Sequence, residues 1–239
     1  MPLIRLQKFL SEAGACSRRK GESHIRSGHV TVNGEVVTTL GTKVDPEADT
    51  VHLNGQPVVR SDRLVYVMLN KPQGVVTSCH HRGEPVVTDL VDLPQRLFPV
   101  GRLDKASTGL LLLTNDGRIH HRLSHPSFDH EKEYDVTVQR PIDDASLTAM
   151  QKGMRLSGTM TRSARVRRLS ARRFHIVLKE GRNRQIRRMV EKMGHRVVRL
   201  HRIRVADLKL GGLTKGEWRH LTEGEARQLL STLQLRNHR

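Results

Sequence analysis

Four consecutive aliphatic residues, Leu110–Leu113, constrain the fold more than any other stretch of this 239-residue chain. Turn-forming residues bound the run, with Ser107-Thr108-Gly109 before it and Asn115-Asp116-Gly117 after it. A short apolar run between turn signals predicts a strand that is buried on both faces of a sheet. The preceding acid, Asp104, would then lie on a loop that enters the sheet core, held rigidly but open to a substrate.

The charge of the chain predicts a polyanionic partner. Lys and Arg total 42 against 24 Asp and Glu, which gives a net charge of +18 and a pI near 11.0. Contacts from Lys and Arg to phosphates release counterions and dominate nucleic-acid affinity. A membrane surface could also attract such a chain, but no apolar run approaches the roughly 18 residues needed to span a bilayer. With no signal-like apolar segment at the N-terminus, we expect a cytoplasmic protein that binds RNA or DNA.

Cysteine and histidine usage predicts neither a disulfide framework nor a metal site. The two cysteines lie far apart, which is typical of a chain in a reducing compartment. The adjacent pairs His80-His81 and His120-His121 cannot each place two side chains on one face of a helix or strand. His125 and His130 have no Cys or acid set at recognised ligand spacing. We predict no metal and no cofactor.

Residues 3–59 predict a small α+β unit. An amphipathic helix ends at Gly14, and Ser17 is a good N-cap for a second helix over Arg18–Ser27. Asn33-Gly34 and Asn54-Gly55 are strong hairpin signals. The basic cluster Arg18-Arg19-Lys20 falls at a helix start, where the helix dipole disfavours cations. A cluster in an unfavourable place indicates use in binding, although a solvated basic face is the alternative.

Residues 60–64 predict a short polar linker, and residues 65–231 a larger second domain with mixed elements. Its capping box, Thr222 with Glu225, opens a last helix that runs through Leu230, and we expect residues 232–239 to be a disordered tail. Val197–Val205 alternates apolar and basic residues, which predicts a strand with one wet, basic face. The remaining expected elements are strands over Leu64–Leu69, Glu131–Val138, Ser163–Leu169 and Phe174–Leu178, and helices over Arg118–Leu123 and Ile142–Met154.

The segment Glu180–His195 predicts a helix with two distinct stripes. Four apolar residues stand at i, i+3, i+4 and i+7: Ile186, Met189, Val190 and Met193. Three guanidiniums repeat a similar spacing on another stripe: Arg184, Arg187 and Arg188. The apolar stripe would seat the helix on the sheet, while the basic stripe would point toward phosphate or an acid.

Taken together, these motifs resemble those of the RsuA/RluB/RluE/RluF family of RNA pseudouridine synthases, most closely the RluF and then the RluB type. The stretch G-R-L-D-K-A-S-T-G-L-L-L-L-T-N-D-G is similar to the family's catalytic motif, which implies that Asp104 is the catalytic residue. The E-K-E-Y segment resembles the K-x-Y motif, which implies that the Tyr134 ring packs on the target base; without the likeness, a core residue is the better interpretation. The likeness of G-R-N-R-Q-I-R-R implies that Arg187 pairs with Asp104 and lowers its pKa.

The resemblance also implies the architecture. The N-terminal order of helix, S-R-R-K helix and V-T-V-N-G strand resembles the S4 RNA-binding domain. The implied fold is α+β: a small S4-like domain, then a pseudouridine synthase domain with a mixed, mainly antiparallel sheet flanked by helices. Lys71 and Pro72, in L-N-K-P-Q-G, are implied supports of the active-site sheet. The expected RNA-binding residues are Arg5, Lys8, Arg18, Arg19, Lys20, Lys71, Arg102, Arg184 and Arg188.

The implied activity is isomerisation of a specific uridine to pseudouridine by a monomeric enzyme. The RluF and RluB likeness favours 23S ribosomal RNA near the peptidyl-transferase centre, with 16S ribosomal RNA or a tRNA anticodon loop as alternatives. The sequence allows three roles for Asp104: attack on the sugar, attack on the base, or removal of a sugar proton. A non-catalytic S4-type RNA-binding or ribosome-assembly factor is the competing hypothesis, because a retained fold does not guarantee activity.

Overall fold

The computed structural model describes residues 2–60, 63–124 and 129–235, and the chain separates into two compact units. The N-terminal unit holds Met1–Val65 with the short segments Pro94–Arg96 and Asn115–Gly117, and the C-terminal unit holds the remainder. Part of the predicted 60–64 linker lies outside the described residues. Within the described chain, no helix is long and apolar enough to cross a membrane.

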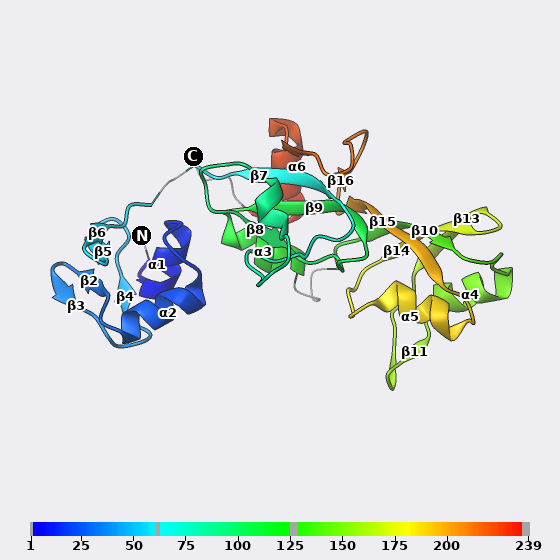
Figure 1. Ribbon diagram of the computed structural model, residues 1–239, viewed down its shortest axis with the longest axis horizontal. Helices are drawn as coiled ribbons and strands as arrows, with labels where there is room; N and C mark the ends of the chain where they lie inside the picture. The colour runs from blue at the N-terminus through cyan, green and yellow to red at the C-terminus, as the bar shows by residue number, and fades with distance from the viewer. Residues whose placement is uncertain (1, 61–62, 125–128, 236–239) are drawn as a thin grey trace. The chain divides into compact units, whose positions relative to one another are not determined.

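The N-terminal unit places two helices against short antiparallel strands (Figure 1). Strands β3, β2, β5 and β6 form one sheet in that order, and β1 pairs with β4. Both Asn-Gly pairs have positive φ at each residue, the backbone that the tightest hairpins require. The element bounds are β1 Ile4–Arg5, α1 Leu6–Glu12, α2 Arg18–Arg26, β2 Val30–Val32, β3 Glu35–Val36, β4 Lys43–Val44, β5 Val51–Leu53 and β6 Gln56–Pro57.

The two N-terminal helices pack closely because α2 carries a glycine at their contact. A Cβ built on Gly21 would lie 3.4 Å from Cys16, Gln7 and Leu10 atoms, so a larger side chain would push the helices apart. Leu6, Leu10 and Ile25 are fully buried at this contact. The predicted cap is also present, since the Ser17 hydroxyl accepts a hydrogen bond from the Lys20 amide.

The C-terminal unit is built on one mixed sheet. Its described strands run in the order β13-β14-β10-β15-β9-β7-β17, with β16 on β15 and β8 on β9. The bounds of its strands are β7 Tyr66–Lys71, β8 Phe98–Val100, β9 Thr108–Thr114, β10 Lys132–Val138, β11 Arg155–Leu156, β12 Thr159–Met160, β13 Arg165–Ser170, β14 Arg173–Leu178, β15 Val197–Val205, β16 Leu208–Lys209 and β17 Trp218–His220. The bounds of its helices are η1 Val87–Leu90, α3 Gly117–Ser124, α4 Asp144–Lys152, α5 Gln185–Lys192 and α6 Glu223–Thr232.

The predicted α+β class and mainly antiparallel sheet are confirmed, and so is the doubly buried central strand. Leu110–Leu113 lies within β9, and each of its four leucines is at most 2% exposed. Two separate hydrophobic cores pack on the described sheet, and Leu110 and Leu112 of β9 belong to the second. One joins α4 and α5 to β10, β14 and β15, and the other joins α3 and α6 to β7, β9 and β16. Figure 1 shows α4 and α5 lying together beside β10 and β14.

The two halves of this sheet meet where β9 runs parallel to β15, the one parallel strand pairing among the described residues of the nine-stranded sheet. The register pairs His201 with Thr108 and Arg202 with Gly109. Gly109 has φ +106°, and a Cβ there would lie only 2.3 Å from the Arg202 carbonyl oxygen. Only glycine therefore fits at this junction.

Several element predictions need correction. The helix expected from residue 180 begins at Gln185, because Arg184 has φ +49° and ends the preceding loop. The tail expected from residue 232 starts too early: α6 runs to Thr232 and Leu233 is buried, while residues 236–239 lie outside the described chain. The alternation expected for β15 also fails, because the β10–β15 register shifts at two points and Arg202 is buried.

Candidate active site

Asp104 lies on a short loop before β9, and Lys71 fixes the backbone of that loop. Lys71 ends β7 and is fully buried. Its ammonium donates hydrogen bonds to the carbonyl oxygens of Pro72 (2.9 Å), Ser107 (3.0 Å) and Asp104 (3.4 Å). The predicted role of Lys71 in RNA binding is therefore wrong, because its charged group faces the loop backbone and not solvent.

The environment of Lys71 also changes its acidity. Burial lowers the pKa of Lys71 to about 8; Asp104 opposes this shift, and Arg202 adds to it. A cation that pointed into an apolar core would be costly, but three carbonyl dipoles surround this one. The loop that carries Asp104 is thus held from beneath by an ammonium whose pKa is lowered to about 8.

Arg187 holds the other side of the same loop. It lies on α5, is 8% exposed, and donates to the carbonyl oxygen of Ala106 (3.1 Å) and the hydroxyl of Ser107 (3.4 Å). Burial lowers the pKa of Arg187, as does Arg184, whereas Asp104 and Glu191 raise it. No direct ion pair joins Asp104 and Arg187 in the described structure, so the pairing implied by the family likeness is not formed here. The buried Nε of Arg187 has no partner in the described chain and remains available as a donor.

Arg202, which the sequence pattern placed on a wet strand face, is instead 3% exposed beneath the loop. Its guanidinium donates to the carbonyl oxygens of Leu110 (2.8 Å) and Arg102 (3.4 Å). These bonds link β15 to β9 and to the segment before Asp104. Lys71, Arg187 and Arg202 therefore form a cage of three buried cations, from three different elements, around the Asp104 loop.

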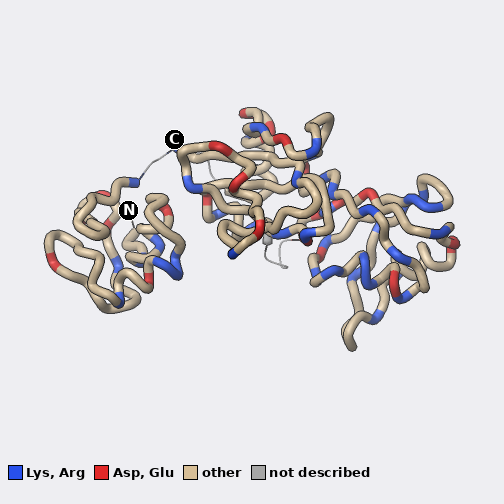
Figure 2. The backbone as a smooth tube through the Cα atoms, in the orientation of Figure 1, with Lys and Arg blue, Asp and Glu red and all other residues tan. Residues whose placement is uncertain are grey.

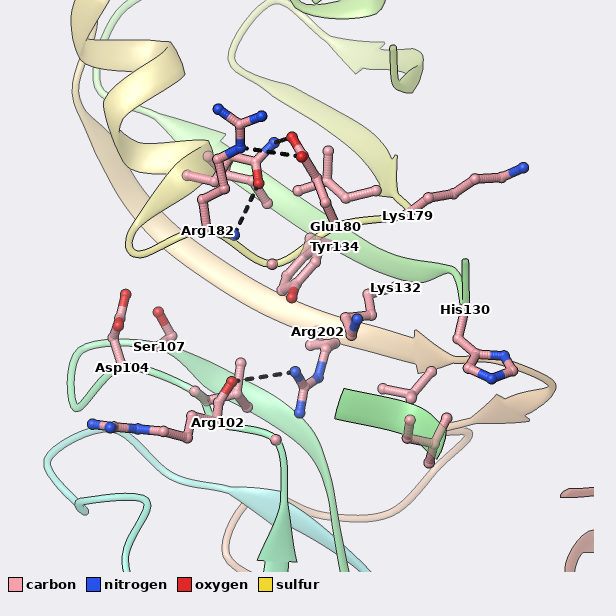
Figure 3. Close-up of a pocket in the computed structure, with 18 of the residues that line it drawn as sticks. Arg102, Asp104, Ser107, His130, Lys132, Tyr134, Lys179, Glu180, Arg182 and Arg202 are labelled. Carbon is pink, nitrogen blue, oxygen red and sulfur yellow. Dashed lines mark hydrogen bonds and ion pairs between the residues drawn. The ribbon is translucent and has the colours of Figure 1, made fainter. Parts of the chain in front are cut away.

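A cavity of about 480 Å³ opens above this cage and is lined by two of the three predicted catalytic residues, Asp104 and Tyr134, but not by Arg187. Asp104 comes from the loop, Tyr134 from β10 and Ile186 from the start of α5. Figure 3 shows the Tyr134 ring projecting into the space between Asp104 and Arg202. The volume falls in the range of small-molecule sites, and its mixed apolar and polar lining suits a nucleoside. The Arg102 side chain is exposed and points away from Tyr134 in Figure 3.

The wall of the cavity opposite the loop is fixed by a polar network. Glu180 accepts from Arg182 (3.1 Å) and Gln185 (2.6 Å), and the Gln185 side chain accepts from the Arg182 amide (3.2 Å). The Arg182 guanidinium also binds the carbonyl oxygens of Thr159 and Met160, which tethers the β11–β12 hairpin. The loop before α5 is thereby rigid, and Arg182 is occupied within the protein.

The three arginines expected in one basic row point to different partners. Arg184 is exposed and precedes the helix, Arg187 is buried in the cage, and Arg188 binds the Ser157 hydroxyl at the tip of the β11–β12 hairpin. That hairpin was not predicted, although Ser157-Gly158 is a turn signal with positive φ at both residues. Only Arg184 of the three has a side chain without a partner in the described chain.

The N-terminal candidates lie on a different kind of surface. Arg18, Arg19 and Lys20 occupy the first turn of α2, are exposed, and make no side-chain hydrogen bond or ion pair within the described chain. Figure 2 shows this cluster of basic residues at the start of α2. Arg5 is exposed at the start of α1, and Lys8 pairs with Glu12 at 3.5 Å.

Sequence reasoning missed four Lys and Arg residues that line the cavity: Lys132, Lys179, Arg182 and Arg202. Lys132 was visible as the first residue of the K-x-Y segment, but that motif drew attention to Tyr134 alone. Arg202 could not be found from alternation, because the strand bulges shift it to the cavity face. Positive charge inside the cavity was therefore underpredicted, and positive charge on the α5 surface was overpredicted.

Comparison with known proteins identifies the family. Residues 65–192 match the family of RNA pseudouridylate synthases, and residues 4–51 match the S4 domain. The chain belongs to the RNA pseudouridine synthases. This pseudouridine synthase is 41% identical over 233 residues to the dual-specificity RNA pseudouridine synthase RluF of Escherichia coli O6:H1 (strain CFT073), a match covering 97% of this chain and 80% of that protein.

Two further relatives agree. The ribosomal large subunit pseudouridine synthase B of Bacillus subtilis (strain 168) is 42% identical over 233 residues, covering 94% of this chain and 95% of that protein. A crystal structure of a pseudouridylate synthase matches this synthase with a TM-score of 0.70 and 34% identity, covering 95% of this chain and 99% of that chain. These matches confirm the predicted family, fold class and enzyme class. The roles assigned to Asp104, Tyr134 and Arg187 stay predictions.

Proposed function

We propose that this synthase converts one uridine of 23S ribosomal RNA, near the peptidyl-transferase centre, to pseudouridine in the cytoplasm. The observation that carries the proposal is the convergence of Asp104, Tyr134 and Arg202 on one cavity, with Arg187 bound to the backbone of the Asp104 loop. The name of the Bacillus relative, a large-subunit enzyme, supports ribosomal RNA of the large subunit as the substrate.

The reaction requires a base to be detached, turned and rejoined. The C1′–N1 bond breaks, the uracil rotates, and a C1′–C5 bond forms while C5 loses a proton and N1 gains one. Asp104 supplies the charged oxygen at the sugar, and the cage fixes where that oxygen lies. Tyr134 offers a ring on which a base that has left its RNA stack can rest. The isomerisation is balanced without an oxidant, reductant or phosphate donor.

Cationic surfaces on each of the two units would bind the RNA. Exposed Arg102 and Arg184 border the cavity, and the Arg18-Arg19-Lys20 cluster offers phosphate contacts from the S4 domain. Lys71 and Arg187 lie outside this set because their donors face the Asp104 loop.

Pseudouridine mapping of RNA from cells with and without the protein tests the proposal. We expect one site in 23S ribosomal RNA to be lost on deletion and restored by the wild-type chain but not by Asp104→Asn. The RluF relatives are named dual-specificity enzymes, which favours a second RNA substrate, and the same map would report a tRNA site, the alternative that the sequence left open. Loss of a site only in 16S ribosomal RNA would overturn the choice of substrate. If deletion changed no pseudouridine site, and if Asp104→Asn fully complemented the deletion, the non-catalytic factor would be favoured.

A further inference from the structure

Lys132 is a half-buried cation that the described structure leaves without a partner. It is the first residue of β10 and lines the cavity. No hydrogen bond or ion pair joins its ammonium to any described residue, and burial together with nearby Arg202 lowers its pKa. A buried charge without compensation costs folding free energy. Such a group is typical of a site that a ligand completes.

Arg202 provides a second group of unused donors at the same place. The strand register sets Arg202 opposite Tyr134, and Lys132 lies two residues before Tyr134 on the same strand. Alternate residues of a strand point to one face, so the ring and the two cations share the cavity wall. The Arg202 Nε and one terminal nitrogen bind loop carbonyl oxygens, and its other terminal nitrogen has no partner in the described chain. Figure 3 shows Lys132 and Arg202 beneath the Tyr134 ring.

The acids that line the cavity do not neutralise these cations. Asp129 pairs with Arg162, and Glu180 is bound by Arg182 and Gln185. Asp104 lies on its own loop at the left of Figure 3, apart from Lys132 and Arg202. Lys132 and Arg202 therefore give the wall under Tyr134 only hydrogen-bond donors, since ammonium and guanidinium groups cannot accept.

We propose that Lys132 and Arg202 read the target base by donating hydrogen bonds to a carbonyl oxygen of uracil. The inference rests on the proposed function, with the base lying on Tyr134. Uracil presents two carbonyl oxygens, whereas cytosine replaces one with an amino group, whose protons would face the protons of these donors. Leaving buried donors unpaired is a strong basis for rejecting a similar ligand. The pair would therefore select uridine against cytidine.

The same pair would stabilise the detached base. When the C1′–N1 bond breaks, its electron pair leaves with the uracil, and the negative charge spreads to the carbonyl oxygens. Cations already fixed in a desolvated wall stabilise such developing charge without reorganisation. C5 of the turned uracil then bonds to C1′, the C5 proton passes to solvent, and N1 takes up a proton, so that atoms and charge balance.

The test compares binding of matched RNAs that carry uridine, cytidine or an abasic ribose at the mapped site. Binding is measured in the Asp104→Asn background, so that the uridine RNA is not converted. We expect this parent to prefer uridine over cytidine by about 10- to 100-fold. Adding Lys132→Met should reduce the preference to within about threefold. Lys179→Met is the matched control: this lysine also lines the cavity, but it is exposed and its side chain points away from Tyr134 in Figure 3, so its removal should weaken binding of both RNAs equally.

A full uridine preference in the Lys132→Met variant would overturn the inference. The inference would also be overturned if the variant lost the same affinity for all three RNAs and its salt-dependence slope fell by about one. That result would assign Lys132 to a phosphate contact. Thermal melting checks the fold, and the Lys132→Met variant should melt no lower than its parent because it removes an uncompensated charge. Failure of the proposed function is a separate result: the wild-type chain would then form no pseudouridine in the uridine RNA.

Discussion

The basic residues of this synthase serve in two different ways, and the Asp104 loop and the start of α2 show the contrast. Around the loop, Lys71, Arg187 and Arg202 are buried and donate to backbone or hydroxyl oxygens. At the start of α2, the cluster Arg18-Arg19-Lys20 is exposed and has no side-chain partner in the described chain. A net charge of +18 therefore does not measure RNA-binding capacity. RNA-binding capacity depends instead on exposed donors that have no partner within the protein.

This difference bears on how substitutions should behave. A buried cation that holds a loop acts on the position of Asp104, so its removal should reduce turnover and stability. An exposed cation acts on phosphate, so its removal should reduce affinity and the salt dependence of binding. The two groups should separate cleanly into these two classes of defect.

The largest effect is expected at the glycine where the two sheet halves meet. Gly109→Ala would place a Cβ 2.3 Å from the Arg202 carbonyl oxygen at φ +106°, so the free energy of unfolding should fall by more than about 3 kcal/mol. Gly216→Ala is the control, because Gly216 has φ +90° but no atom within 4 Å of the added Cβ, and it should lose only about 1 kcal/mol. Denaturant unfolding measures both. Equal losses would show that the close approach of β9 and β15 does not support the loop.

The next effect is expected from removal of the buried lysine of the cage. Lys71→Met removes the donor that three carbonyl oxygens share and leaves that of Asp104 with only the Ser107 amide, so kcat should fall roughly 10- to 100-fold with little change in RNA affinity. Lys105→Met is the matched control, because Lys105 is exposed and pairs with Glu84. A Lys71→Met variant with reduced affinity and normal kcat would move Lys71 into the RNA-binding class.

The pH dependence of the same residue sharpens the assignment. Because the pKa of Lys71 is about 8, its ammonium loses a donor as pH rises through 8, and kcat should fall there in the wild type but not in Lys71→Met. Stability should move in the opposite sense. The folded pKa lies below the ordinary value of 10.5, so the contribution of Lys71 to stability rises between pH 8 and 10.5. If kcat and stability both fell as pH rises through 8, the loss of kcat would reflect general unfolding.

A smaller effect, of the other class, is expected from the exposed cluster. Alanine at Arg18, Arg19 and Lys20 together should raise the Kd for RNA by about tenfold and reduce the salt-dependence slope by roughly two. The kcat at saturating RNA should not change, and alanine favours the helix, so α2 should persist. Unchanged affinity and slope would mean that this surface is only a solvated basic face.

The sequence predicted the parts of the fold that depend on local patterns. The aliphatic run Leu110–Leu113 is the buried strand, and the apolar stripe of Ile186, Met189 and Val190 does seat α5 on the sheet. Patterns of this kind survive because burial of apolar surface determines them. The same stripe analysis grouped Arg187 with Arg184 and Arg188 in one basic row, whereas the structure buries Arg187 under the Asp104 loop.

The parts that could not be predicted depend on contacts between distant segments. The strand bulges that bury Arg202 arise from pairing with β10, about seventy residues earlier, and no alternation within β15 reports them. Lys71 and Ser107 lie 36 residues apart in the chain, and their hydrogen bond exists only after β7 and β9 have paired. Family likeness indicated which residues matter, whereas geometry was needed to separate supports of the loop from groups that can face RNA.

The central claim, that Asp104 on its caged loop isomerises uridine, is tested most directly with purified protein and RNA carrying tritium at uridine C5. Joining C5 to the ribose releases that tritium, so its release counts turnovers. We expect steady release by the wild-type chain and a decrease of at least about a thousandfold for Asp104→Asn, with RNA affinity within about threefold of wild type. Release at the wild-type rate by Asp104→Asn, with equal RNA affinity, would contradict the account.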